Sequence, residues 1–106
     1  MAELSGFERM KVCKQIFVSG LVQGVFFRDS TWRKANELNL EGGVRNLRDG
    51  RVEVQLTGEE VAVQSLIKWL EIGPKHAKVS TIEVIDLPLT DQQDSKKGSF
   101  DIWPTR

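Results

Sequence analysis

The chain has 106 residues, 40% of them hydrophobic and 28% charged, which suits one domain with an ordinary core and leaves little room for a second. Fifteen Lys and Arg residues balance fifteen Asp and Glu residues, and this net charge of +0 gives no reason to expect a nucleic-acid or membrane partner. One cysteine and one histidine are too few for an intrachain disulfide or a Cys/His zinc site, so we expect no metal.

Residues 1–9 are polar and precede a second methionine, Met10. We interpret them as a flexible leader or a remnant of an expression vector, and we assign the domain to residues 10–106. The sequence has no secretory signal and no apolar run of the about 18–20 residues that spans a bilayer. The default expectation is therefore a cytoplasmic protein.

The first half of the chain predicts a strand, a loop and a helix. Apolar residues at even positions predict a strand over Met10–Ser19, and the glycine-bounded stretch Gly20–Arg28 predicts a loop. Asp29 and Ser30 are possible N-caps of a helix of about three turns. Asn39 is suited to the left-handed conformation that terminates such a helix.

The second half predicts a hairpin, a helix and one or two further strands. The Asp-Gly pair at 49–50 predicts a turn between strands at 41–46 and 51–56. A helical stripe of apolar residues, Val63, Leu66, Ile67 and Leu70, predicts a helix that ends at Gly73-Pro74. Residues 78–87 alternate like a strand, residues 91–98 form a polar loop, and residues 100–103 suit a short closing strand.

This order of elements predicts an α+β domain of the ferredoxin-like β-α-β-β-α-β type, an antiparallel sheet with both helices on one face. The loop between the first strand and the first helix is a candidate anion site. Gly20 and Gly24 allow backbone N–H groups to converge on an oxyanion, and Arg28 offers a planar guanidinium. The residues alone leave a second interpretation open, in which the glycines only turn the chain and Arg28 is solvated.

Two ordered runs of residues carry more information than the loop alone. The first comprises Val18, Gly20, Val22, Gln23, Gly24, Val25, Phe27 and Arg28, and the second comprises Gly42, Val44, Asn46, Gly50, Val52 and Gly58. In order and spacing they closely resemble the two signature segments of the acylphosphatase family. The resemblance spans nearly the whole domain. It implies a cofactor-free and metal-free hydrolase of the carboxyl–phosphate bond of acyl phosphates.

Carried over residue by residue, the resemblance makes Arg28 the phosphate-binding arginine and Asn46 the residue that orients the attacking water. It assigns phosphate binding also to the backbone amides of Val22, Gln23, Gly24, Val25 and Phe26. The chemistry agrees, because phosphoryl transfer from a good leaving group needs mainly placement and charge neutralisation. Asn46 has both an acceptor and a donor, but it is no general base at neutral pH.

The chain departs from the family at two positions. Gly43 stands where the family usually has a large aromatic residue, and Leu21 stands where it often has a basic residue. We expect Trp32 or Trp103 to refill the space above Gly43, and Leu21 to weaken anion capture. Because Gly43 lies close to Asn46 in sequence, an unfilled space there would disturb the pose of Asn46.

We expect the other residues with reactive or charged side chains to have structural rather than catalytic roles. Cys13 lacks the arginine of a Cys-x5-Arg phosphatase and is expected to be a strand cysteine, and His76 is expected in an exposed loop. The three arginines at 45, 48 and 51 are read as a solvated hairpin edge, with attraction of anionic substrate as the alternative. Phe27 and Trp32 are expected in or near the core, because the aromatic RNA-binding signature is absent.

The sequence thus predicts a cytoplasmic, monomeric acylphosphatase whose partners are a small acyl phosphate and, as product-like ligands, inorganic phosphate or sulfate. The competing prediction is a non-catalytic anion-binding or regulatory domain, in which Gly43 and Leu21 have abolished turnover.

Overall fold

The computed structural model describes residues 10–89 and 98–106. The expectations for the leader at 1–9 and for positions 91–97 of the polar loop lie outside these residues. The elements in chain order are β1 (Lys11–Leu21), α2 (Phe27–Glu37), β2 (Glu41–Asn46), β3 (Val52–Glu59), α3 (Glu60–Leu70), β4 (Lys78–Leu87) and β5 (Phe100–Ile102).

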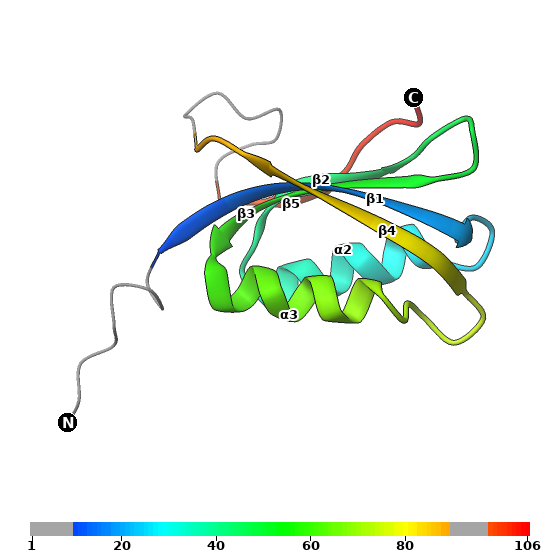
Figure 1. Cartoon of the computed structure of the whole chain (residues 1–106), viewed down its shortest axis with the longest axis horizontal. Coiled ribbons are helices and arrows are strands. Elements are labelled where there is room, and N and C mark those ends of the chain that lie inside the picture. The colour runs from blue at the N-terminus through cyan, green and yellow to red at the C-terminus, as the bar shows by residue number, and fades with distance from the viewer. Residues whose placement is uncertain (1–9, 90–97) are drawn as a thin grey trace.

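The strands form one sheet in the order β4-β1-β3-β2-β5, and both helices pack on the same face of it (Figure 1). This confirms the ferredoxin-like α+β prediction. The pairs β1–β3, β1–β4 and β2–β3 are antiparallel, as expected, but β5 pairs with β2 in parallel. The five-stranded sheet is therefore mixed rather than wholly antiparallel, because β5 enters beside β2 and runs in the same direction.

The core lies between the sheet and the two helices. Alternate residues of the central strands point toward the helices, as the period of a strand requires. The apolar side chains that form this core are at most 2% exposed, and burial of each large one stabilises the fold by about 1.5–3 kcal/mol. The largest fully buried side chains are Phe27, Phe100, Ile16, Leu56, Leu66, Leu70, Val18, Val22, Val44, Val52, Val54 and Val63.

Helix α2 begins earlier than the sequence predicts. Its first residue is Phe27, and Phe26 before it has the left-handed angles φ 62° and ψ 23°. Asp29 and Ser30 are therefore not N-caps, and the Ser30 N–H donates instead to the Phe26 carbonyl at 2.9 Å. The consequence for the site is that Arg28 lies in the first turn of the helix.

The buried face of α2 explains this start. Phe27, Thr31 and Ala35 follow one another at four-residue spacing and are at most 1% exposed. Trp32 lies one position away from this stripe and is 39% exposed, so its predicted place in or near the core is wrong. At the other end of the helix, Asn39 has a φ of 59°, which confirms the predicted left-handed termination. In the described part of the chain, neither helix is long and apolar enough to cross a membrane.

The sheet face opposite the helices buries an ion pair. The Arg45 Nε donates to Glu53 Oε1 at 2.8 Å, and the Gln15 Nε2 donates to Glu53 Oε2 at 2.8 Å. Arg45 is 7% exposed and Glu53 is 5% exposed. The prediction of a solvated arginine is therefore wrong for Arg45. Arg45 lies opposite Glu53 in the β2–β3 register. Trp103 covers it, with the ring centroid 4.8 Å from the guanidinium carbon.

Trp103 also fills the space above Gly43. A Cβ added at position 43 would overlap the fused ring of Trp103, so the indole lies directly on the glycine backbone. The prediction that an aromatic residue from elsewhere refills this space is confirmed for Trp103, whereas the exposed Trp32 lies on the outer side of α2.

We predict that the Glu53 carboxylate makes stability depend on pH in the acid range. Burial raises its pKa, but the hydrogen bonds from Gln15 and Arg45 outweigh burial and hold the pKa below its ordinary value of 4.5. The Glu53 carboxylate therefore makes its full contribution to the free energy of unfolding above pH 4.5. That contribution is lost as the pH falls through the lower pKa of the folded state. Glu53→Gln should reduce the free energy of unfolding by about 3–5 kcal/mol at pH 7, since breaking a buried ion pair leaves a buried charge.

Urea unfolding of both proteins between pH 7 and pH 3 measures this difference, which should shrink below pH 4.5. The control is Glu83→Gln, which removes an exposed carboxylate on β4. A Glu53→Gln penalty that stays constant down to pH 3 contradicts the assignment.

Candidate active site

The β1–α2 loop and the β2–β3 hairpin lie at the same end of the sheet (Figure 1). A cleft of about 350 Å³ opens there. The residues that line it are Val22, Gln23, Gly24, Phe26, Phe27, Arg28, Asp29 and Asn46. The structure thus brings together residues of both sequence segments. Of the predicted site residues, Val25 alone is not in the lining, and its side chain packs against the core.

The loop backbone is shaped like an anion cradle. Gly24 and Phe26 both have positive φ, 77° and 62°, and residues in this conformation between others turn successive N–H groups to one side. The loop leads directly into the first turn of α2, where the first amides have no acceptor within the helix and the helix dipole adds partial positive charge. An anion in the cleft would therefore meet several N–H donors at once.

Two of the residues that line this cleft each carry a buried side-chain atom without a partner. Arg28 Nε and Asn46 Oδ1 have no hydrogen-bond partner among the described residues, and each is inaccessible to solvent. Leaving such atoms unpaired costs about 1–3 kcal/mol each. A donor and an acceptor that both lack partners in one cleft indicate a site that receives a ligand.

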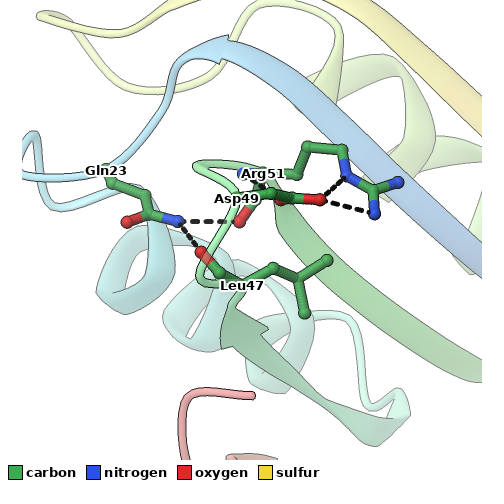
Figure 2. Close-up of polar contacts among 4 residues, drawn as sticks. All are labelled: Gln23, Leu47, Asp49 and Arg51. Atoms are coloured by element: carbon green, nitrogen blue, oxygen red, sulfur yellow. Dashed lines mark hydrogen bonds and ion pairs between the residues drawn. The ribbon is translucent and has the colours of Figure 1, made fainter.

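Gln23 joins the two halves of the site. Its Nε2 donates to the carbonyls of Leu47 at 2.7 Å and Arg51 at 2.8 Å, on both arms of the β2–β3 turn (Figure 2). Leu47 directly follows Asn46, so this side chain fastens the loop backbone next to Asn46. The sequence assigned only the backbone amide of Gln23 to the site. The position of its side chain depends on a contact between residues 24 positions apart.

The turn itself is closed by its own residues. The Leu47 N–H donates to the Arg51 carbonyl at 2.8 Å, and the Gly50 N–H donates to the Leu47 carbonyl at 3.1 Å. Asp49 pairs with the Arg51 guanidinium at 2.8 Å (Figure 2). The side-chain hydrogen bond from Arg51 holds the pKa of the exposed Asp49 carboxyl below its ordinary value. The turn is thus a defined platform for the Gln23 side chain.

A second hollow, of about 240 Å³, lies at the opposite ends of the same elements, between Lys11, Asn39 and Glu59. None of the buried unpaired polar atoms of the described residues belongs to it. The cleft at Arg28 and Asn46 is therefore the better candidate.

The remaining candidates have the structural places expected of them. Cys13 is buried in β1, and its Sγ accepts a hydrogen bond from the Thr57 hydroxyl at 3.2 Å. His76 is exposed in the loop before β4. Neither lines the cleft. Within residues 10–89 and 98–106, no three His, Cys, Asp or Glu side chains lie together as a metal site would require.

The fold and the cleft define a ferredoxin-like domain with a candidate site in the loop before a helix N-terminus. The Acylphosphatase family matches residues 14–102. An acylphosphatase of Pseudomonas paraeruginosa is 53% identical over 79 residues, which cover 74% of this chain and 87% of the relative. The chain belongs to the acylphosphatase family.

Solved structures of the family agree with the fold. An acylphosphatase from Coxiella burnetii has a TM-score of 0.79 and 39% identity, with 88% of this chain and 93% of that chain covered. The crystal structure of acylphosphatase from Bacillus subtilis has a TM-score of 0.79 and 34% identity, with 87% of this chain and 98% of that chain covered.

We predict that the donor capacity of Gln23 stabilises the site. Gln23→Glu keeps the shape of the side chain but sets a carboxylate against two carbonyl oxygens, so it should lower the free energy of unfolding by about 1–3 kcal/mol at pH 7. Gln23→Ala should cost less, because it removes the donor without adding charge. Urea unfolding measures both, with Gln64→Glu on the exposed side of α3 as the control. Equal losses in the free energy of unfolding for Gln23→Glu and Gln64→Glu would contradict a stabilising role of the Gln23 hydrogen bonds.

Proposed function

We propose that this protein is a hydrolase that cleaves the carboxyl–phosphate bond of acyl phosphates and releases a carboxylate and inorganic phosphate. The observation that carries the proposal is the pair of unpartnered atoms, Arg28 Nε and Asn46 Oδ1, in one cleft beside a helix N-terminus. Membership of the acylphosphatase family supplies the reaction class.

In this proposal the phosphoryl group lies in the loop formed by residues 22–26. The backbone amides of Val22, Gln23, Gly24, Val25 and Phe26 and the Arg28 guanidinium bind its non-bridging oxygens. A guanidinium suits this task because its planar fork donates two parallel hydrogen bonds to one oxyanion. Donors placed before the reaction stabilise charge as it redistributes in the transition state.

Asn46 has the second role, which is to orient the attacking water. Its Oδ1 is a buried acceptor without a partner among the described residues. For Asn46 to take this role, the carboxamide has to turn its Oδ1 toward the water when substrate enters the cleft. The water oxygen bonds to phosphorus, the bond from phosphorus to the carboxyl oxygen breaks, and the electron pair leaves with the carboxylate. The proton of the water passes to a phosphate oxygen, so no side chain has to act as a base.

The proposal extends to the setting of the enzyme. Its partner is a small acyl phosphate, its product-like ligands are inorganic phosphate or sulfate, and the reaction needs neither metal nor organic cofactor. We place the enzyme in the cytoplasm as a monomer, which cell fractionation and size-exclusion chromatography can check.

Arg28→Ala is expected to abolish detectable hydrolysis of benzoyl phosphate, and Arg28→Lys is not expected to restore it. An ammonium group carries the same charge but cannot reproduce the fork of a guanidinium. Initial rates of benzoyl phosphate cleavage measure the effect. Arg33→Lys on the exposed side of α2 is the matched control. Near-normal turnover by Arg28→Lys contradicts the proposed binding mode.

Asn46→Ala is expected to lower kcat by about 100- to 1000-fold while inorganic phosphate binds nearly as before, since one well-placed group of the transition state is lost. Steady-state kinetics measure kcat, and protection against thermal unfolding by added phosphate measures binding. Asn36→Ala, on the exposed side of α2, is the control for loss of a carboxamide. Equal losses in turnover and in phosphate binding count against the orientation of water.

The same two measurements separate the enzyme from a non-catalytic anion-binding domain. Phosphate protection of the wild-type protein without any hydrolysis of benzoyl phosphate would favour the binding domain.

A further inference from the structure

The residues after β5 continue along the outer edge of β2. The Trp103 N–H donates to the Val44 carbonyl at 2.8 Å, and the Arg106 N–H donates to the Asn46 carbonyl at 3.1 Å. The Arg106 carbonyl in turn accepts the Arg48 N–H at 2.9 Å. This segment, residues 103–106, is red in Figure 1 and leads from β5 toward the β2–β3 hairpin. We call it the C-terminal segment.

The Trp103 side chain packs the C-terminal segment against the sheet. The Trp103 ring lies on Gly43, where any Cβ would collide with it, and its face lies 4.8 Å from the Arg45 guanidinium carbon. Arg45 Nη2 is buried without a hydrogen-bond partner among the described residues, and the ring face partly offsets that loss. Arg45 is itself held by Glu53. The indole therefore sits in a place shaped for it.

Asn46 depends on its backbone for its orientation. Because its Oδ1 accepts no hydrogen bond, no contact at that oxygen fixes the rotation of the carboxamide. The backbone of Asn46 is paired with Val52 of β3 on one side and with Arg106 on the other. Leu47, the next residue, is held by Gln23. The C-terminal segment thus supplies the support on the edge of β2 that faces away from β3.

We propose that the C-terminal segment is a positioning element for Asn46, with Trp103 as its anchor and the Arg106 N–H as its contact. The inference rests on the proposed role of Asn46 in orienting water. The C-terminal segment contacts no substrate in this account. Its effect is on turnover, through the placement of one catalytic residue, and not on the capture of phosphate by the loop at 22–26.

The test removes one backbone N–H, that of Arg106. Arg106→Pro deletes the donor to Asn46, and the matched variant Arg106→Ala deletes the side chain but keeps the donor. We expect Arg106→Pro to lower kcat for benzoyl phosphate by about tenfold or more, since small misplacements of reacting groups have effects of this size. The inhibition constant of inorganic phosphate should change less than about twofold, and kcat of Arg106→Ala should fall far less than that of Arg106→Pro.

A cycle with Asn46→Ala identifies the residue through which the C-terminal segment acts. If the C-terminal segment acts through Asn46, Arg106→Pro has no further effect on kcat in the Asn46→Ala protein, because coupled residues are not additive. The same loss of kcat in both backgrounds overturns the inference, and so does wild-type kcat in Arg106→Pro. Wild-type kcat in Asn46→Ala itself overturns both the proposed role of Asn46 and this inference.

A second pair of variants guards against a simple failure to fold. Trp103→Ala removes the anchor, and Trp103→Phe keeps an aromatic ring over Gly43. We expect the alanine variant to lose turnover without losing phosphate affinity, and the phenylalanine variant to recover most of the turnover. Parallel losses of kcat and phosphate affinity in Trp103→Ala, with no recovery in Trp103→Phe, indicate a purely structural residue and overturn the inference.

Discussion

Two hydrogen bonds from one carboxamide hold the two halves of the site in register. Gln23 belongs to the loop between β1 and α2 that we propose binds phosphate, and its Nε2 donates to carbonyls on both arms of the turn that follows Asn46. Without these hydrogen bonds, only the sheet would set the position of the β1–α2 loop relative to Asn46 at the end of β2. Because phosphoryl transfer depends on placement, the distance between these loops matters more than any one pKa.

Most of the fold was predictable because the signals were local and agreed with each other. The alternation of apolar residues located β4 with the bounds that the structure has, and the Asp-Gly turn located the hairpin of β2 and β3. The left-handed end of α2 at Asn39 also followed from residue type. The cleft could be predicted as well, since the two segments that line it are those that carry the resemblance to the acylphosphatase family.

What the sequence did not reveal depends on tertiary contacts. The start of α2 moved from Asp29 to Phe27 because burial of Phe27 outweighs the capping preference of a polar residue. Trp32 was misplaced for a related reason, since a helix of this length offers the core only one stripe. The parallel pairing of β5, the burial of Arg45 and the reach of the Gln23 side chain all join residues that are distant in the chain, and no local pattern encodes them.

The glycine at position 43 shows how a departure from a family pattern can be compensated. From the sequence, the missing aromatic residue beside Asn46 suggested a weakened site. In the structure, the ring comes from Trp103, on the strand edge that pairs with β2, and it needs a glycine beneath it because any Cβ would overlap it. The departure at Gly43 is therefore compensated, because the indole of Trp103 occupies the space that a side chain at position 43 would need. This contact of Trp103 with Gly43 ties the C-terminal segment to β2, the strand that ends in Asn46, so a residue that packs on the sheet also supports the backbone of the side chain that we propose to orient water.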